Sequence, residues 1–295
     1  MARFGTVVTA MVTPFAPDGS LDLDAARDLA RWLVDHGTEG IVVAGTTGES
    51  AVLTDPERID LFRAVREAVT VPVVAGATTN DTAHSVEMTR AAAAAGVDAV
   101  LAVVPYYNKP SQAGLDGHFR AVAAASDLPV MLYDVPGRTG RALAADTIVR
   151  LAAEVPTVVA LKDAGGDPAR PLRLAGRVPD GFEVYSGDEP LNLGFAAYGA
   201  VGVVGVASHW TAPRQRALFD AVAAGDLAAA RRLDAELQSS YRFMNTDERV
   251  FSQSVKVALE VLGVRVGECR LPLGPAPAGS DDEARRVLAD CGFAL

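Results

Sequence analysis

The sequence predicts an α/β fold, a (β/α)8 TIM barrel with an appended C-terminal helical bundle. Eight short apolar runs lack alternating polar residues, the pattern of parallel strands covered on both faces, and they begin roughly every 20 to 35 residues. Helical patterns separate nearly all of them, and eight such units over about 220 residues match the length of a barrel. We expect the barrel over 1–224 and a C-terminal helical domain over 225–295.

The eight runs define the expected strands, which are 6–12, 41–45, 72–77, 99–104, 130–133, 158–162, 182–186 and 201–206. The first, in "FGTVVTAMVTPF", is read as a strand because one preceding arginine, the interruption at Pro14 and the lack of an A-x-A pattern argue against a signal peptide. No apolar stretch approaches the roughly 20 residues that span a bilayer, so we expect no membrane partner.

The helices between strands carry their own start and stop signals. "SLDLDAARDLARWLVDHG" offers Ser20 or Asp22 as N-cap and Gly37 as a stop, and "TDPERIDLFRAVREAV" offers Thr54 or Asp55 as N-cap. After the last strand the pattern is wholly helical, with helices expected at 212–224, 226–243, 248–262 and 281–292.

A doubly wound sheet is the main rival fold. It is disfavoured because no strand is followed by G-x-G-x-x-G, and because "GTTGES" lacks the lysine of a phosphate-binding P-loop. Spacing alone favours the barrel but does not prove that the sheet closes.

Composition narrows the classes of partner and compartment. The net charge is −10 and no Lys/Arg-rich run is present, which argues against a nucleic-acid partner. The two cysteines, Cys269 and Cys291, are too few for a disulfide framework and lack C-x-x-C spacing. A reducing cytoplasm fits this composition best.

Polar residues follow several strands at the end where a barrel places its function. Two adjacent hydroxyls stand between glycines in "AGTTGES", paired tyrosines in "VVPYYNKP", and a tyrosine followed by an arginine in "LYDVPGRTG". Each segment also has a structural interpretation as a tight turn, wall packing or an exposed loop. An arginine in such a loop is suited to binding a carboxylate in bidentate fashion.

Lys162 ends the apolar run of "VVALKDAGG". It is either a strand-end lysine that reaches water or an activated amine, because burial of an ammonium is costly and lowers its pKa. A lysine beside tyrosines suits imine chemistry on a carbonyl compound, with a phenol to move protons. An unperturbed lysine is neutral only about once in 2,500 at pH 7, so the site has to lower its pKa.

Other catalytic classes find less support. The four histidines show no metal-ligand spacing, and we expect no metal site. There is no G-x-S-x-G elbow, and neither cysteine lies at a strand end.

Six motifs resemble one family over nearly the whole chain, the dihydrodipicolinate synthase and N-acetylneuraminate lyase family of class I, Schiff-base aldolases. The motifs occur in the family's order and at similar separations; they are "TAMVTPF" (9–15), "GTTGES" (45–50), "PYYNKP" (105–110), "YDVPGRTG" (133–140), "LKDAGG" (161–166) and "SGDE" (186–189).

The resemblance implies a role for each matching residue. Lys162 would form an imine with pyruvate, and Tyr133 would relay protons through Thr46 to Tyr107, which a neighbouring subunit lends. The implied substrate-binding residues are Thr47, Val204, Gly187 and Arg138. No cofactor beyond the covalent imine is implied. The implied partner is a second copy of the chain, in a homo-oligomer expected to be a tetramer built as a dimer of dimers.

Arg138 favours the synthase branch of the family, in which the arginine of this loop binds the carboxylate of aspartate semialdehyde. The implied reaction condenses pyruvate with L-aspartate 4-semialdehyde to 4-hydroxy-tetrahydrodipicolinate, in lysine and diaminopimelate biosynthesis. Two alternatives stay open: another pyruvate-dependent aldolase or lyase acting on a sugar acid or hydroxy-oxo acid, and a non-catalytic barrel protein.

The chain also departs from the family's usual residues. Asp134 and Gly137 replace the commoner Asn and Ser, and Asp163 replaces the commoner Glu. The family's usual Pro-rich C-terminal segment is replaced by "NTDERVFSQSVK" (245–256), so we expect the packing of the helical tail to differ.

Overall fold

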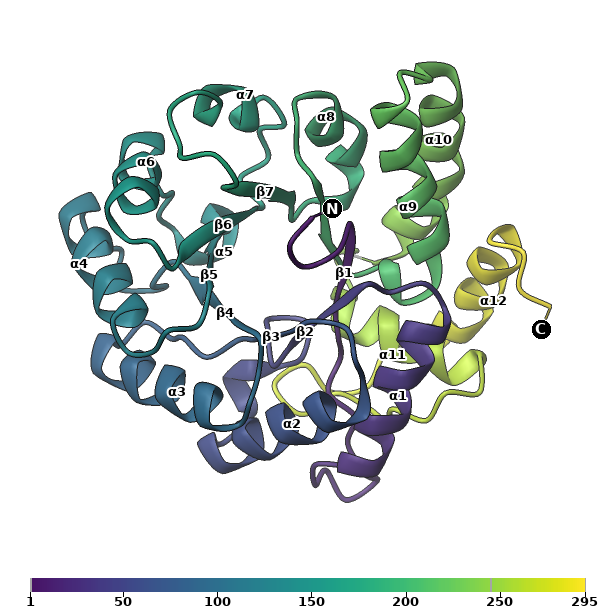
Figure 1. Cartoon of the computed structure of the whole chain (residues 1–295). Helices are drawn as coiled ribbons and strands as arrows, with labels where there is room; N and C mark the ends of the chain where they lie inside the picture. The colour runs from purple at the N-terminus through teal and green to yellow at the C-terminus, as the bar shows by residue number, and fades with distance from the viewer. Residues whose placement is uncertain (1, 245, 295) are drawn as a thin grey trace.

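Eight parallel strands hydrogen-bond in sequence order, and β8 pairs with β1 to close the barrel (Figure 1). This computed structural model describes residues 2–244 and 246–294. The closed sheet confirms the predicted barrel and excludes the doubly wound alternative. The strands are β1 (Val7–Ala10), β2 (Gly40–Val43), β3 (Val73–Ala75), β4 (Ala99–Val103), β5 (Val130–Asp134), β6 (Val158–Asp163), β7 (Glu183–Ser186) and β8 (Gly202–Gly205).

Helices surround the sheet, and the last four lie together on one side of it (Figure 1). The α-helices in chain order are α1 (Leu23–Asp35), α2 (Asp55–Ala68), α3 (Thr82–Ala94), α4 (Gln112–Ala123), α5 (Pro136–Thr139), α6 (Ala145–Glu154), α7 (Arg170–Leu174), α8 (Asn192–Ala197), α9 (Ser208–Ala223), α10 (Leu227–Met244), α11 (Phe251–Val261) and α12 (Ser280–Asp290). Two short 3₁₀ helices, η1 (Ser50–Val52) and η2 (Glu189–Leu191), follow β2 and β7.

At the starts of α1 and α2, predicted N-cap side chains accept hydrogen bonds from free backbone amides. The Asp22 carboxylate accepts a hydrogen bond from the Ala25 amide at 2.9 Å and begins α1. Thr54 begins α2 and exchanges hydrogen bonds with Glu57, so the two residues form a capping box. Gly37, with φ of 95°, follows the end of α1 in the left-handed conformation that glycine tolerates best.

Two of the predicted helix starts were wrong. Helix α9 begins at Ser208 rather than at 212, because the turn before Pro213 is already helical and the Thr211 amide bonds to the Ala207 carbonyl at 3.0 Å. Helix α11 begins at Phe251 rather than at 248, because the Arg249 amide donates to the Thr246 hydroxyl at 3.1 Å and holds a turn ahead of the helix.

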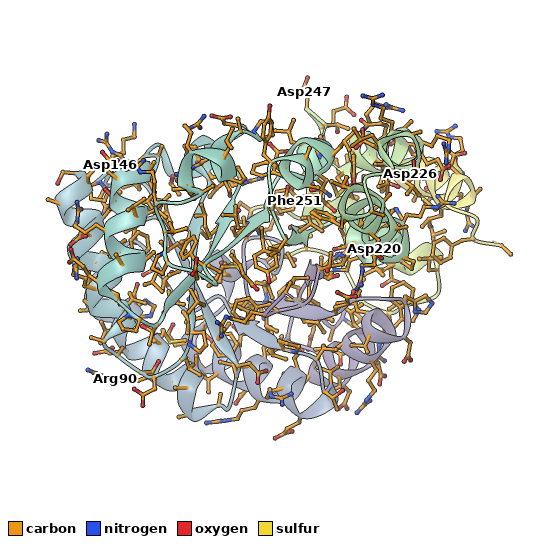
Figure 2. All side chains as sticks on the ribbon, turned by 45° about the horizontal axis from the view of Figure 1, so that its top comes forward. Arg90, Asp146, Asp220, Asp226, Asp247 and Phe251 are labelled. Carbon is orange, nitrogen blue, oxygen red and sulfur yellow. The ribbon has the colours of Figure 1, made fainter. Side chains whose placement is uncertain are left out.

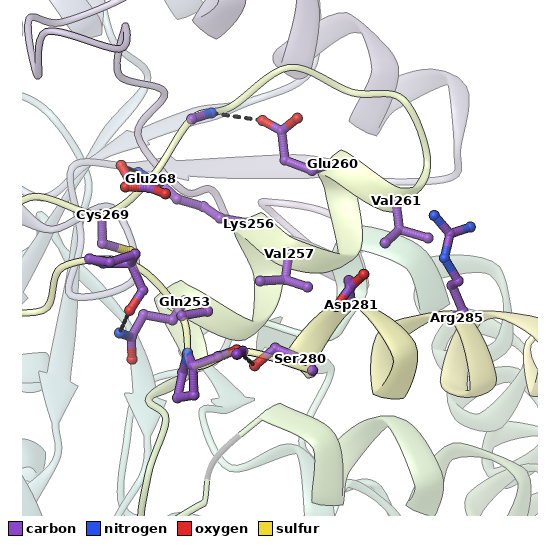
Figure 3. Close-up of a pocket in the computed structure, with 16 residues that line it drawn as sticks. Gln253, Lys256, Val257, Glu260, Val261, Glu268, Cys269, Ser280, Asp281 and Arg285 are labelled. Atoms are coloured by element: carbon purple, nitrogen blue, oxygen red, sulfur yellow. Dashed lines mark hydrogen bonds between the residues drawn. The ribbon is translucent and has the colours of Figure 1, made fainter.

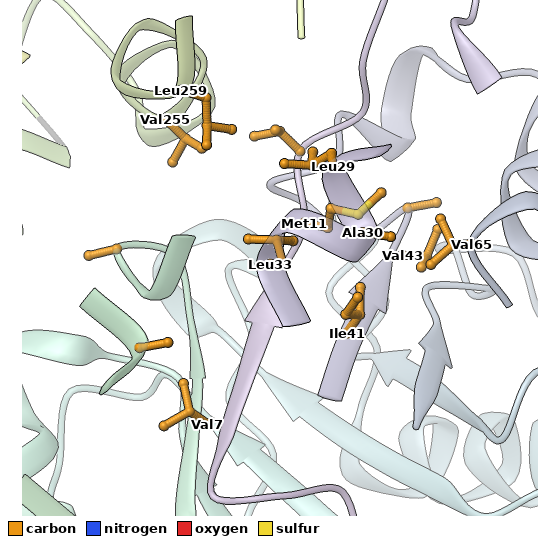
Figure 4. Packing of buried hydrophobic residues seen from close by; sticks show 14 of the residues in the cluster. Val7, Met11, Leu29, Ala30, Leu33, Ile41, Val43, Val65, Val255 and Leu259 are labelled. Atoms are coloured by element: carbon orange, nitrogen blue, oxygen red, sulfur yellow. The ribbon is translucent and has the colours of Figure 1, made fainter. Parts of the chain in front are cut away.

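One apolar core continues from the barrel into the C-terminal helices. Met11 after β1, Leu29 of α1 and Val43 of β2 belong to the same buried cluster as Val255 and Leu259 of α11 (Figure 4). Burial of these side chains fastens α11 over one sector of the barrel. The predicted division at 224/225 therefore crosses a continuous core, and two independent domains stay a prediction.

Candidate active site

Lys162 and Tyr133 lie side by side at the carboxyl ends of β6 and β5, where the strand register pairs the two residues. The Lys162 ammonium nitrogen is 4.3 Å from the centre of the Tyr133 ring, and each side chain is only 6% exposed. The sequence placed both residues at strand ends, and closure of the barrel makes them neighbours. An amine and a phenol thus share one buried position.

The pKa of Lys162 is lowered to about 8, chiefly by burial; the carboxylate of Glu189 opposes this shift, and the positive charge of Arg138 adds to it. With that pKa, roughly one molecule in ten carries a neutral amine at pH 7. The activated form of the lysine is therefore present in a useful fraction.

Lys162 is also distinct among the lysines of the chain, which are Lys109, Lys162 and Lys256. Lys256 is buried but pairs with the Glu49 carboxylate at 2.8 Å, and Lys109 is exposed. Within the described residues, Lys162 is the buried lysine without a carboxylate in ion-pair contact. It is the amine best suited to nucleophilic attack.

Tyr133 keeps its proton at neutral pH because burial raises its pKa, although the nearby Arg138 charge and a hydrogen bond with the Thr46 side chain oppose the rise. A protonated phenol that bonds to the Thr46 hydroxyl, with the Lys162 amine over its ring, is placed to pass protons within this site. Thr46 lines a small cavity together with Tyr133 and a second cavity, of about 190 Å³, together with Arg138.

The loop that carries Thr46 and Thr47 is fixed by the C-terminal part of the chain. Buried Glu49, in a left-handed conformation with φ of 56°, accepts from the Arg270 amide at 2.9 Å as well as pairing with Lys256. The Ser252 hydroxyl donates to the Thr47 carbonyl at 3.0 Å. These contacts hold both threonines in place from outside the barrel.

Gly187, at the end of β7, leaves room for the lysine. A Cβ atom at this position would lie 3.0 Å from Cγ and 3.1 Å from Cε of Lys162. Contacts this short are rare between packed carbon atoms, so a larger residue at 187 would require the Lys162 side chain to shift by a few tenths of an ångström. The predicted binding residue therefore has a steric role next to Lys162.

Glu189 is a residue whose function the sequence reasoning missed. Its buried carboxylate accepts from the Val206 amide at 2.8 Å, the Ala207 amide at 3.0 Å and the Gln215 side chain at 2.6 Å. It thereby fixes the turn that follows Val204 at the end of β8. The motif "SGDE" was the available signal, but the partners lie 17 to 26 residues away and only the fold reveals them.

A buried ion cluster lies on the outer side of the same two strands. Asp134 and Asp163 stand directly after Tyr133 and Lys162 and pair in register. The Arg170 guanidinium contacts the Asp134 carboxylate at 2.5 Å and the Asp163 carboxylate at 3.3 Å, and it also donates to the Leu143 carbonyl. Because the three charges join β5, β6 and α7, they hold the amine and the phenol in register.

Arg138 and Tyr107 lie farther out than the other predicted residues. Arg138 is exposed in short helix α5, and its guanidinium carbon is 4.5 Å from the centre of the Phe251 ring. Tyr107 is 89% exposed, with φ of 72°. Within one chain the structure brings together Lys162, Tyr133, Thr46 and Gly187 but leaves Tyr107 directed at solvent.

A larger groove lies elsewhere and contains none of the predicted site residues. It has a volume of about 620 Å³ and lies between α11 and the segment before α12, where Lys256, Glu260, Cys269 and Arg285 line it (Figure 3). Across residues 2–244 and 246–294, no cluster of three or more His, Cys, Asp and Glu side chains is arranged for a metal ion. In the same residues, no helix is long and apolar enough to cross a membrane.

A family model described as the dihydrodipicolinate synthetase family matches residues 3–290. The chain belongs to this family. The resemblance stated from the six motifs is thereby confirmed, and the match extends through the C-terminal helices.

Named relatives are similar over their full length. A 4-hydroxy-tetrahydrodipicolinate synthase of Moorella thermoacetica is 45% identical, covering 99% of each chain. The 4-hydroxy-tetrahydrodipicolinate synthase 2 of Streptomyces coelicolor is 48% identical, covering 99% of this chain and 97% of its own. The crystal structure of the family enzyme from Cyanidioschyzon merolae with lysine bound has a TM-score of 0.94 at 40% identity, covering 100% of both chains.

Proposed function

We propose that the chain is a lyase of the class I aldolase type that condenses pyruvate with L-aspartate 4-semialdehyde to 4-hydroxy-tetrahydrodipicolinate, a step toward lysine and diaminopimelate. The observation that carries this proposal is the buried, ion-pair-free Lys162 amine at the end of β6, next to the Tyr133 phenol. Family relatives that are 45% and 48% identical over nearly the whole chain carry the name of this activity.

In the proposed reaction, the neutral Lys162 amine attacks the ketone carbon of pyruvate and water leaves, forming an iminium. Loss of a methyl proton then gives an enamine, whose carbon attacks the aldehyde of the second substrate. The amine of that substrate displaces Lys162 and closes the ring. The iminium is itself the electron sink, so the reaction as proposed needs no separate cofactor.

The neighbouring residues transfer protons, bind the pyruvate carboxylate and hold the loop that carries the two threonines. Tyr133 and Thr46 exchange protons with the carbinolamine and the enamine, since their hydroxyls are coupled to each other and Tyr133 contacts the lysine. Thr47 and the backbone at Val204 bind the pyruvate carboxylate. The C-terminal helices act as an appended unit that holds the Thr46–Thr47 loop, through Ser252 and Lys256.

The pH dependence of imine formation follows from the lowered pKa of Lys162. Only the neutral amine attacks, so the initial rate of borohydride trapping with pyruvate should rise as the pH increases from 6 and level off above about 8. The measurement is mass spectrometry of the trapped protein at fixed times. A rate that keeps rising as steeply above pH 9 would mean that the amine is not activated.

Replacement of Arg138 by alanine should separate the two substrates. We expect trapping with pyruvate to persist, with its half-maximal pH shifted upward because the Arg138 charge lowers the pKa of Lys162. The KM for aspartate semialdehyde should rise by about 10-fold or more, since a bidentate, charge-assisted contact is lost. The assay couples product formation to the next reductase of the pathway. If pyruvate trapping fell as much as the use of aspartate semialdehyde, the separate role of Arg138 in binding the second substrate would be refuted.

The same coupled assay on the parent protein tests the proposed function itself. Consumption of aspartate semialdehyde is the expected result. Trapping of pyruvate without any such consumption would leave the imine in place but point to another pyruvate-dependent aldolase or lyase, one that acts on a sugar acid or hydroxy-oxo acid.

We also propose that the active form is a homo-oligomer, a tetramer built as a dimer of dimers, in the cytoplasm. Tyr107 supports the oligomer because its backbone has the positive φ that bulky residues rarely adopt, and because its side chain is 89% exposed and so buries little against the described residues of its own chain. A neighbouring subunit would receive this tyrosine next to its own Thr46.

A further inference from the structure

The Arg138 guanidinium has an aromatic partner. Phe251 of α11 lies 4.5 Å from its carbon atom, within the range of a cation–π contact. Within residues 2–244 and 246–294, the Arg138 side chain forms no ion pair and no hydrogen bond. Arg170 differs, since two carboxylates and a carbonyl occupy its guanidinium. Arg138 therefore keeps its donors available.

The kind of partner decides what Arg138 is able to bind. A guanidinium is planar, and its N–H groups point outward from the edges of the plane. A carboxylate partner from the protein would occupy those edges and compete with an incoming carboxylate. An aromatic ring 4.5 Å from the guanidinium carbon attracts the cation but offers no carboxylate oxygen to its N–H groups. The ring contact thus holds the cation in place without pairing its donors with a protein carboxylate.

Hydrogen bonds hold the chain on both sides of Phe251. The Val250 amide donates to the Gln253 side-chain oxygen at 3.1 Å, and the Ser252 hydroxyl bonds to the Thr47 carbonyl at 3.0 Å. The amide group of Gln253 donates in turn to three carbonyls, at Leu273, Gly274 and Pro275. Phe251 is half-buried, and Figure 2 labels its position among the side chains.

Arg138, Phe251, Ser252 and Thr46 also line the same cavity of about 190 Å³. The ring therefore stands in the wall of the space that lies between Arg138 and the threonine coupled to Tyr133. We propose that Phe251 is a positioning residue, whose ring contact holds Arg138 so that its unpaired N–H groups receive the carboxylate of the second substrate. This inference rests on the proposed function and deepens it.

The test is a double-mutant cycle with Phe251→Leu, Arg138→Ala and the double variant, and with Phe251→Tyr as the conservative control. Leucine keeps an apolar side chain but lacks the ring face. We expect Phe251→Leu to raise the KM for aspartate semialdehyde by about 2-fold to 30-fold, the range of cation–π energies. The KM for pyruvate should stay as in the parent, and Phe251→Tyr should resemble the parent.

In the Arg138→Ala background, Phe251→Leu should have no further effect, because the residue acts through the arginine. An equal rise in KM in both backgrounds, or a parallel loss of pyruvate trapping, would overturn the inference. If the parent traps pyruvate but does not consume aspartate semialdehyde, the proposed function fails instead. In that case pyruvate trapping alone tests whether Phe251 positions Arg138. The half-maximal pH of trapping should then move upward in Phe251→Leu, as it does in Arg138→Ala. An unchanged half-maximal pH would overturn the inference.

Discussion

The Lys162→Met variant is expected to fold and to lose turnover by a factor of roughly 10⁴ or more, because no other group in the site forms the imine. Methionine has a similar length and fills the space between the Tyr133 ring and Gly187. The measurement compares turnover and denaturant unfolding of the variant with those of the parent. Lys109→Arg, at an exposed lysine, is the matched control and should retain activity.

The same variant should be at least as stable as the parent at pH 7. The pKa of Lys162 falls from 10.5 to about 8 on folding, so burial of the charged amine costs on the order of 3 kcal/mol below pH 8. The folded state binds fewer protons than the unfolded chain between these values, so this cost fades as the pH rises from about 8 toward 10.5. A variant clearly less stable than the parent at pH 7 would contradict this assignment.

The Arg170→Met variant should lose about 3–5 kcal/mol of unfolding free energy, because it leaves two buried carboxylates without their cation. Asp134 and Asp163 are completely buried, and Arg170 is their shared partner. The measurement is denaturant unfolding at pH 7. The matched control is Arg173→Met, one turn along, whose pair with Asp167 is half-exposed and should matter by less than about 1 kcal/mol.

The unfolding free energy that Arg170→Met loses relative to the parent should also decrease as the pH falls. Burial raises the pKa of both aspartates in the folded parent, although the arginine opposes this rise. Without the arginine both values should rise further, so the folded variant takes up protons more readily than the unfolded chain as the pH falls. The deficit should therefore be largest at neutral pH and shrink in acid. A loss within 1 kcal/mol of the control, or a deficit that grows in acid, would contradict the cluster's role.

The sequence predicted the parts of the site that depend on local pattern. Apolar runs marked where strands end, and barrel topology places strand ends together, so Lys162 and Tyr133 could be named before their contact was visible. The loop residues Thr46 and Thr47 followed from the same rule. Tyr107 was predicted as a subunit-crossing residue from the family resemblance, and its exposure in one chain is compatible with that prediction.

The parts that escaped prediction depend on contacts between distant segments. Arg170 reads as an ordinary loop arginine in "DPARPLRL", because only the pairing of β5 with β6 places two aspartates beneath it. Phe251 reads as the first apolar residue of a helix, and its contact joins positions 113 residues apart (251 minus 138). The steric need for Gly187 likewise arises only once the Lys162 side chain is placed across from it.

The most direct test of the central claim is borohydride reduction in the presence of pyruvate, followed by peptide mapping. The chain has three lysines, so the adduct is easily assigned. We predict one pyruvate-derived adduct per chain, on the peptide that contains Lys162. No adduct, or an adduct on Lys109 or Lys256 with Lys162 unmodified, would contradict the account.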